Sequence, residues 1–507
     1  MKKNIFTQVQ LTKPESNVFD LSHDVKLSFN MGELIPIMVQ ECIPGDKFNI
    51  SCESLLRFAP LVSPVMHRMD VTMHYFFVPN RILWDGWEDF ITQTDPGTGI
   101  PAFPHEVIDS GSYTRLHDYL GIPIPDGPAG EVLNALPMAA YQAIYNEYYR
   151  DENLIDEIDY KVVDGFNNAA ALDVLRLRAW EHDYFTSALP FAQKGTPVGI
   201  PLGDVIISPE WDPSAVAPWP AFVKRDQTNA ADGNIAMATL GLSQITAGNA
   251  EHPLAFDPKG SLTTSPTTIN DLRRAFKLQE WLERNARGGT RYIENILAHF
   301  GVKSSDKRLQ RPEYITGTKS PVVISEVLNT TGTDDLPQGN MAGHAVSVTN
   351  GKYGNYYCEE HGFIIGIMSV MPVTAYQQGV PKHFLKVNDA FEYYWPSFAH
   401  IGEQPVTVSE LYAYQTDGLT TFGYVPRYAE YKYAPSRVAG DFRTSLKFWH
   451  LGRIFLSTPS LNQEFIECVP DPRIFAVTDE DVQKMYAHVY NKVRAVRKMP
   501  FFGNPEL

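Results

Sequence analysis

Alternating apolar residues in extended segments constrain this chain's fold more than any other feature. Val71, Met73, Tyr75 and Phe77 share one face of a predicted strand, and Pro79 ends it because proline has no N–H to donate. Further strands are expected at 34–39 and around Phe48, with a turn between them. Alternation of this kind is what a two-sheet sandwich requires, because one face of each strand packs against the opposite sheet.

A second group of strands follows much later in the chain. Apolar segments at 322–327, 363–370, 406–412 and 422–433 are separated by turn signals. Together with the N-terminal strands, they bring the count close to the eight of a jelly roll. We therefore expect a mainly β fold, an eight-stranded antiparallel jelly-roll sandwich with long loop and helical insertions. Because the strands come from both ends of the sequence, the sandwich is expected to be one interrupted domain.

On the jelly-roll interpretation, the chain divides into three segments. Residues 1–195 hold the N-terminal part of the jelly roll with loop and helix insertions, 196–268 form an inserted surface loop, and 269–507 hold a helical insertion, the C-terminal part of the jelly roll and a C-terminal helix. Helices are predicted from Pro137 to Tyr148, from 270 to 288, and from 293 to 300, where apolar residues recur at offsets of three and four.

The segment 196–268 differs in amino-acid composition from the segments before and after it. Prolines cluster in its first part, small residues follow, and no helical or strand period emerges. Long segments of this kind are usually functional loops or disordered linkers. Trp211, Trp219 and Phe222 favour an ordered excursion.

The last segment is predicted to be a helix that starts at Thr478 as N-cap, with acidic residues in its first turn. Val482, Met485, Val489, Val493 and Val496 follow at offsets of three and four. Positive charge near a helix C-terminus is favourable in itself. The basic residues that this preference does not explain make this end a candidate nucleic-acid-facing patch, comprising Lys492, Arg494, Arg497 and Lys498.

Aromatic and basic side chains also interleave between Phe422 and Leu456. Aromatic faces stack on bases and basic groups neutralise phosphates, so single-stranded nucleic acid is a plausible partner. The same residue types anchor protein–protein interfaces, and Tyr431 and Tyr433 fit one strand face. Both interpretations stay open, with packing or an interface favoured. The nucleic-acid-facing candidates here are Arg427, Arg437 and Arg443.

Charge and cysteine content limit the function further. The net charge is −16, so any contact with a polyanion must come from local basic patches. Four scattered cysteines indicate free thiols in a reducing compartment. Cys358 and His361 could be half of a zinc site, but no second half follows, so no metal and no cofactor are expected. Neither a signal peptide nor a membrane span is predicted, and synthesis in the cytoplasm is expected.

Several longer motifs resemble one known family. They are Phe19-Asp20-Leu21-Ser22-His23-Asp24, Ile43-Pro44-Gly45-Asp46, Tyr75-Phe76-Phe77-Val78-Pro79-Asn80-Arg81, Asp183-Tyr184-Phe185-Thr186-Ser187-Ala188-Leu189-Pro190, the run from Pro426 to Arg443, and Phe448-Trp449-His450-Leu451-Gly452-Arg453. The sequence resembles the major capsid proteins of microviruses, small icosahedral phages with single-stranded DNA, and is most similar to the gokushovirus branch. The motifs span nearly the whole chain apart from 196–268.

The resemblance implies a structural role and a set of partners. It implies a T=1 shell of identical subunits around a single-stranded DNA genome, with a small basic internal DNA-binding protein, a pilot protein and a scaffolding protein. It also implies an outward insertion near the threefold axis. The gokushovirus branch lacks a separate spike, so this insertion, assigned to 196–268, would contact a host surface receptor through Trp211, Trp219 and Phe222.

No catalytic constellation emerges from the sequence. Metalloprotease, nucleophile-elbow, Walker and paired-cysteine motifs are missing. The alternative class is a carbohydrate-binding or carbohydrate-active β-sandwich, in which aromatic rings stack on sugars and two carboxylates act as acid and base. Nothing in the sequence singles out such a carboxylate pair, so no catalytic residue is assigned.

Overall fold

The structure is a computed structural model of the chain, and it describes residues 15–502 with gaps. The gaps are 95–96, 98, 128, 169, 200–267 apart from four short strands, 331–340 and 480. Two compact units can be distinguished, one formed by residues 1–192 with 285–507 and the other by residues 193–284.

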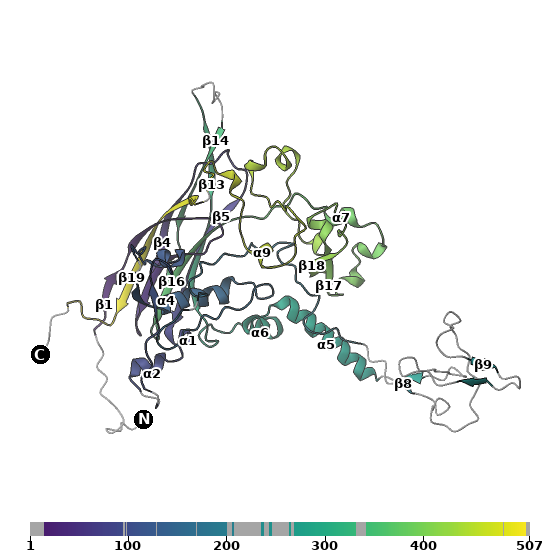
Figure 1. Cartoon of the computed structure of the whole chain (residues 1–507), viewed down its shortest axis with the longest axis horizontal. Coiled ribbons are helices and arrows are strands. Elements are labelled where there is room, and N and C mark those ends of the chain that lie inside the picture. Colours follow the sequence, from purple (N-terminus) through teal and green to yellow (C-terminus); the bar gives the residue numbers. More distant parts are fainter. Residues whose placement is uncertain are drawn as a thin grey trace. The chain divides into compact units, whose positions relative to one another are not determined.

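The first unit is built on two antiparallel sheets (Figure 1). In the larger sheet the order is β1–β19–β4–β14–β13, with β2 also on β19 and β15 also on β4. Its strands are β1 (Asn17–Asp20), β2 (His23–Phe29), β4 (Lys47–Phe58), β13 (Val323–Leu328), β14 (Met341–Asn350), β15 (Gly354–Tyr357) and β19 (Met485–Arg497). We call it the seven-stranded sheet.

The second sheet has the order β12–β5–β16–β3, formed by β12 (Glu313–Pro321), β5 (Met69–Pro79), β16 (Gly362–Pro372) and β3 (Ile35–Cys42). In the seven-stranded sheet, β1 and β2 pair with successive parts of the same edge of β19, so they share one strand position. In the same way, β14 and β15 pair with successive parts of β4 and share one position. That sheet therefore has four strand positions plus β13 at its edge. Apart from β13, the two sheets together have eight strand positions, as a jelly roll does, which confirms the predicted fold class.

The core lies between the two sheets and follows the alternation of the strands. Met73, Tyr75 and Phe77 point into it from β5, as the sequence predicted. One polar residue joins them: Asn491 accepts a hydrogen bond from the Tyr75 hydroxyl (2.8 Å) and donates to the Ile37 carbonyl (2.8 Å). These bonds satisfy an amide that would otherwise be buried at a cost of a few kcal/mol.

The first insertion leaves the sandwich after β5 and returns at β12. It contains α1 (Asn80–Leu83), α2 (Trp87–Thr92), β6 (His105–Ile108), α3 (Arg115–Leu120), β7 (Glu131–Asn134), α4 (Leu136–Ile144), a π-helical turn (Tyr145–Tyr149), α5 (Ile269–Gly288) and α6 (Tyr292–Phe300). The helices expected at 137, 270 and 293 are therefore confirmed. Apolar residues of α4 pack on the outer face of the four-stranded sheet, against Phe76, Val78 and Ile365. Because of this second layer, β16 is buried on both faces.

The second unit contains the pairs β8 (Val205–Ile206) with β11 (Thr263–Thr264), β9 (Ile235–Met237) with β10 (Ser243–Ile245), and most of α5. Within it, the Lys194 amide donates to the Leu282 carbonyl (3.4 Å). The expected insertion at 196–268, including Trp211, Trp219 and Phe222, lies almost wholly outside the described residues.

The second insertion runs from β16 to β19 and has its own small core. It contains α7 (Lys382–Leu385), β17 (Glu403–Thr407), α8 (Val408–Leu411), β18 (Thr421–Pro426), α9 (Gln463–Ile466) and several 3₁₀ turns. The strand expected at 406–412 is wrong in part, because α8 begins at Val408. The strand expected at 422–433 ends at Pro426, because Tyr428 takes a left-handed conformation (φ 62°) and a 3₁₀ turn follows. Tyr431 and Tyr433 therefore do not mark a strand face.

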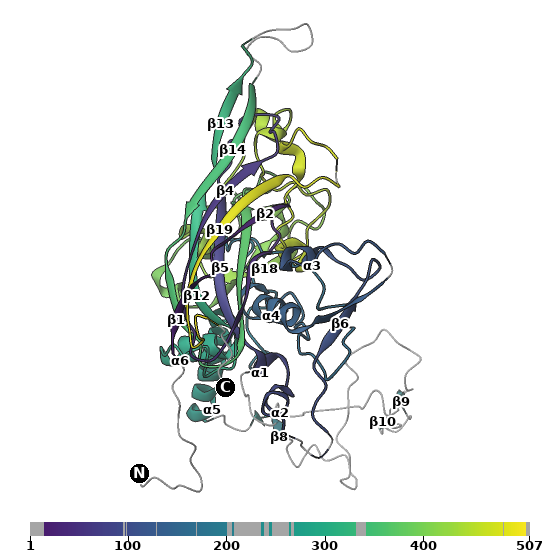
Figure 2. The same cartoon turned by 90° about the vertical axis from the view of Figure 1, so that its left-hand side faces the viewer.

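The predicted C-terminal helix is wrong, because residues 485–497 form an interior strand of the sheet, β19, between β4 on one side and both β1 and β2 on the other (Figure 2). Met485, Val489 and Val493 are four apart, and this spacing fits a strand of period two as well as a helix. Ala487, Asn491 and Ala495 fill the intervening inward positions, and being small or polar they were not recognised as core.

Candidate functional site

The outward side of β19 presents aromatic and basic side chains in regular alternation. Tyr486, His488, Tyr490, Lys492 and Arg494 point away from the core, while the residues between them are buried. Because side chains alternate along a strand, these five form one row on the surface. In the predicted helix, the same five side chains would lie on different faces and would not form a row.

Neighbouring strands widen the row into a surface, which we call the outer face of the seven-stranded sheet. The register places Arg57 beside Tyr486, Lys26 beside His488 and Lys47 beside Val496. Basic residues of this face are Lys26, Lys47, Arg57, Lys492 and Arg494, and acidic residues are Asp20, Asp24 and Glu53. The face is therefore locally positive on a chain whose net charge is −16.

Contacts between basic and acidic side chains compensate part of the charge on this face. Lys492 binds Glu53, and His488 Nε2 lies 2.8 Å from an oxygen of Asp24. Arg494 is opposite Asp20 in the register and is exposed. Tyr353, Tyr490, Lys492 and Arg494 together line one shallow depression. An aromatic and cationic depression of this kind suits a base and its phosphate.

The other two C-terminal candidates have different positions. Arg497 lies at an inward position of β19, with Nε 3.3 Å from the fully buried carboxylate of Asp46 and its guanidinium over the Phe48 ring. Burial raises the pKa of Asp46, and Arg497 opposes that shift. The Lys498 side chain packs on Gly45, which has a positive φ of 96°. The sequence-predicted patch is therefore only partly assembled, with Lys492 and Arg494 side by side.

The candidates from the aromatic stretch lie in the second insertion rather than on the sheet. Arg427 donates to the Phe391 carbonyl (2.7 Å) and stacks on Tyr428 (4.7 Å to the ring centroid). Arg443 donates to the Val438 carbonyl (2.8 Å). Both therefore hold local structure. Arg437 instead lines a groove of about 350 Å³, with Met66, Arg68, Phe442 and Trp449 among its other lining residues.

Sequence reasoning missed most of the outer face. Lys47, Arg57, Tyr353, Tyr357 and Tyr486 were not singled out, although all are exposed there. The period-two alternation from 485 to 495 is the sequence signal that could have identified Tyr486. The others follow only from strand pairing across hundreds of residues, which one sequence does not reveal.

A cluster of buried ionisable groups lies in the first insertion, where Glu106, His117 and Asp173 bring their polar atoms within 4.8 Å of one another. These residue types could hold a divalent cation. The tautomer of His117 argues against that, because the Thr114 amide donates to Nδ1 (2.9 Å) and the neutral imidazole therefore carries its proton on Nε2. Nε2 lies 3.1 Å from Asp173 Oδ1, so it faces Asp173 as an N–H group rather than as a ligand.

The same cluster must hold an additional proton. Neither carboxylate oxygen of Glu106 has a hydrogen-bond donor, although the residue is 3% exposed. Burial and the nearby Asp173 carboxylate raise the pKa of Glu106 to about 8. A proton on Glu106 supplies the missing donor and lets the two carboxyl groups hydrogen-bond. At neutral pH the pair therefore carries one negative charge rather than two.

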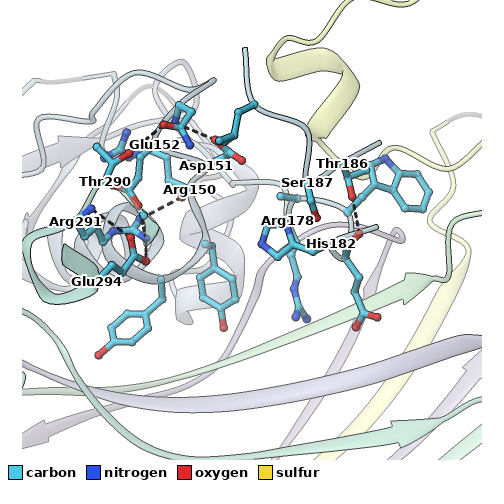
Figure 3. Close-up of a pocket in the computed structure, with 18 of the residues that line it drawn as sticks. Arg150, Asp151, Glu152, Arg178, His182, Thr186, Ser187, Thr290, Arg291 and Glu294 are labelled. Carbon is cyan, nitrogen blue, oxygen red and sulfur yellow. Dashed lines mark hydrogen bonds and ion pairs between the residues drawn. The ribbon is translucent and has the colours of Figure 1, made fainter. Parts of the chain in front are cut away.

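A concave region of about 890 Å³ in the first insertion is lined by residues that form ion pairs with one another (Figure 3). Arg291 lies 3.1 Å from Glu152 and 3.7 Å from Glu294, and it donates to the carbonyls of Asn146 and Arg150. Burial raises the pKa of Glu152 to about 7, against the opposing effect of Arg291. These groups bind one another and hold the turn between α5 and α6 in place.

Comparison with known proteins decides the family. A family model described as capsid protein (F protein) matches residues 7–507. The capsid protein VP1 of Chlamydia phage 1 is 35% identical over 591 aligned residues, covering 100% of this chain and 98% of the relative. That of Bdellovibrio phage phiMH2K is 36% identical over 523 residues (99% and 97%), and that of Spiroplasma virus 4 is 30% identical over 535 residues (97% and 95%). The chain belongs to this phage capsid protein family.

As a member of the phage capsid protein family, the chain is the major capsid protein of a small single-stranded DNA phage, of the gokushovirus type that its motifs indicated. Family membership gives the chain a structural role in the virion capsid, and it favours this role over a carbohydrate-active sandwich. Among the described residues, every helix is too short or too polar to cross a bilayer.

Proposed function

We propose that this capsid protein assembles into a T=1 icosahedral shell and that the outer face of its seven-stranded sheet contacts the single-stranded DNA genome. The observation that carries the proposal is the exposed row of tyrosine and basic side chains along β19. Bases of single-stranded DNA stack on aromatic rings with little sequence preference, and basic groups bind the phosphates. A genome of arbitrary sequence needs this kind of contact.

The remaining partners follow from the family resemblance and are part of the same proposal. A small basic internal protein neutralises most of the genome's phosphates, because the subunit itself is acidic. A pilot protein and a scaffolding protein act in delivery and assembly. The subunit is made in the host cytoplasm and has no catalytic role. The insertion at 196–268, with Trp211, Trp219 and Phe222, contacts the host receptor.

A pair of matched variants tests the DNA contact. Lys492→Gln with Arg494→Gln removes two charges from the outer face, whereas Arg273→Gln with Arg274→Gln removes two exposed charges from α5. Purified particles are washed at increasing NaCl concentration, and their DNA content is measured. We expect the outer-face variant to release DNA at lower salt, with the salt slope reduced by about 0.7 for each phosphate that the variant no longer neutralises.

The control pair separates DNA binding by the outer face from a general effect of removing positive charge. If both variants retain DNA as the parent does, or if both release it equally, the outer face is not where the genome binds. Failure of the parent protein itself to form particles would contradict the proposed shell.

A further inference from the structure

The two strands β13 and β14 extend beyond the rest of the seven-stranded sheet. β14 pairs with β4 only from Val346 to Asn350, and residues 341–345 pair with β13 and form one isolated bridge, between Gly343 and Leu61. Figures 1 and 2 both show this pair projecting past the sandwich. We call residues 323–328 and 341–345 the ribbon. A two-stranded ribbon is marginally stable in water by itself, so contact with another surface would stabilise it.

The ribbon exposes apolar side chains on both of its faces. The exposed fractions are 62% for Val323, 53% for Val327, 51% for Leu328 and 39% for Met341. Leu328 and Met341 are cross-strand partners on one face, and Val327 points to the other. Within the described part of the chain, β13 also forms the free edge of its sheet. Clustered apolar surface beside a free strand edge marks an interaction site.

Charge identifies the class of partner. The sequence from 321 to 350 contains Glu326, Asp334 and Asp335 but neither lysine nor arginine. Nucleic-acid binding depends on basic groups that neutralise phosphates, so the ribbon is unsuited to DNA. A protein surface that combines apolar and positively charged groups would match it.

The same chain offers such a surface in the groove that holds Arg437. Met66 is 70% exposed at this groove, and the rings of Phe442 and Trp449 line it. Arg68 and Arg437 are exposed and supply positive charge. The apolar part of the groove matches the apolar side chains of the ribbon. Its two arginines match Glu326, the charged side chain of the ribbon within the described residues.

We propose that the ribbon of one subunit docks into the groove lined by Met66, Arg68 and Arg437 of a second copy of this chain. The docking rests on the shell assembly proposed above and names one of its contacts. Ribbon and groove are different surfaces, so the contact is heterologous and closes a ring when repeated about a rotation axis.

The first test changes the apolar character of the ribbon. Val327→Ser, Leu328→Ser and Met341→Ser are combined, and the matched control combines Val327→Ile, Leu328→Met and Met341→Leu. These side chains are exposed, so both variants should match the parent in the melting temperature of the unassembled subunit. We expect the particle yield on a sucrose gradient to fall about tenfold or more for the serine variant, and to stay near the parent value for the control.

The second test reverses charge across the contact. Glu326→Arg and Arg437→Glu should each lower particle yield, and the two together should restore it. A DNA-binding role of Arg437 would give no such restoration. Full assembly of the serine variant, or no recovery in the double reversal, would overturn the docking. If instead the parent protein forms no particles, the proposed shell function fails, and this outcome is distinct from failure of the ribbon alone.

Discussion

Replacing Glu106 by glutamine should stabilise the subunit, although it alters a buried side chain. The folded state holds the proton of Glu106 up to about pH 8, whereas an exposed glutamate loses it near pH 4.5. Between these values the folded state binds more protons than the unfolded state, so stability falls as pH rises. The glutamine amide donates a hydrogen bond to Asp173 as the protonated carboxyl does, but it does not ionise.

The magnitude follows from the pKa difference. One pKa unit corresponds to 1.36 kcal/mol, so a rise from 4.5 to about 8 gives at most about 5 kcal/mol above pH 8. Solvent screening reduces this effect, so we expect Glu106→Gln to add about 2 to 5 kcal/mol at pH 9. At pH 5 the two proteins should differ by less than about 1 kcal/mol, because this pH lies only half a unit above the pKa of an exposed glutamate.

Urea unfolding of the unassembled subunit at pH 5, 7 and 9 tests this expectation. Tyrosine and tryptophan fluorescence reports the transition, and hydrogen exchange of the α3 amides reports whether the change is local to the cluster. The advantage of Glu106→Gln should grow from pH 5 to pH 9. A variant that is less stable than the parent at every pH would refute the shared proton. Stabilisation of the parent, but not the variant, by Mn²⁺ or Zn²⁺ would instead show a metal site.

Two further predictions concern the backbone and the insertion. Gly32→Ala should destabilise strongly, by about 3 kcal/mol or more, because the new Cβ would lie 1.8 Å from the Cys468 carbonyl oxygen. Gly121→Ala has a similar positive φ but open space around it, so thermal melting should show a loss of only about 1 kcal/mol; equal losses would contradict the reasoning. Deleting residues 200–259 should leave particle assembly intact and abolish adsorption to host cells, and normal infectivity of such particles would disprove the host-contact role.

The sandwich could be predicted from sequence because its strands alternate strongly, whereas β19 could not. In β5, Met73, Tyr75 and Phe77 are large and apolar at every inward position. In β19, the inward position at Asn491 is polar, and its burial depends on Tyr75 and Ile37 of distant strands. Local periodicity does not contain that information.

The candidate site was predictable only where basic residues follow one strand. Lys492 and Arg494 lie two apart and share the outer face once the segment is a strand. Arg497 has the opposite parity and binds Asp46, a partner that lies some 450 positions earlier and is identified only by the fold. Charge in the sequence therefore indicated the region, and strand parity decided which side chains share the surface.

A reconstruction of DNA-filled particles at side-chain resolution tests the central claim most directly. We expect the outer face of the seven-stranded sheet to line the interior, with density for nucleotides against Tyr490, Lys492 and Arg494. Particles in which this face points to solvent outside the shell, or is covered entirely by another subunit, would contradict the account.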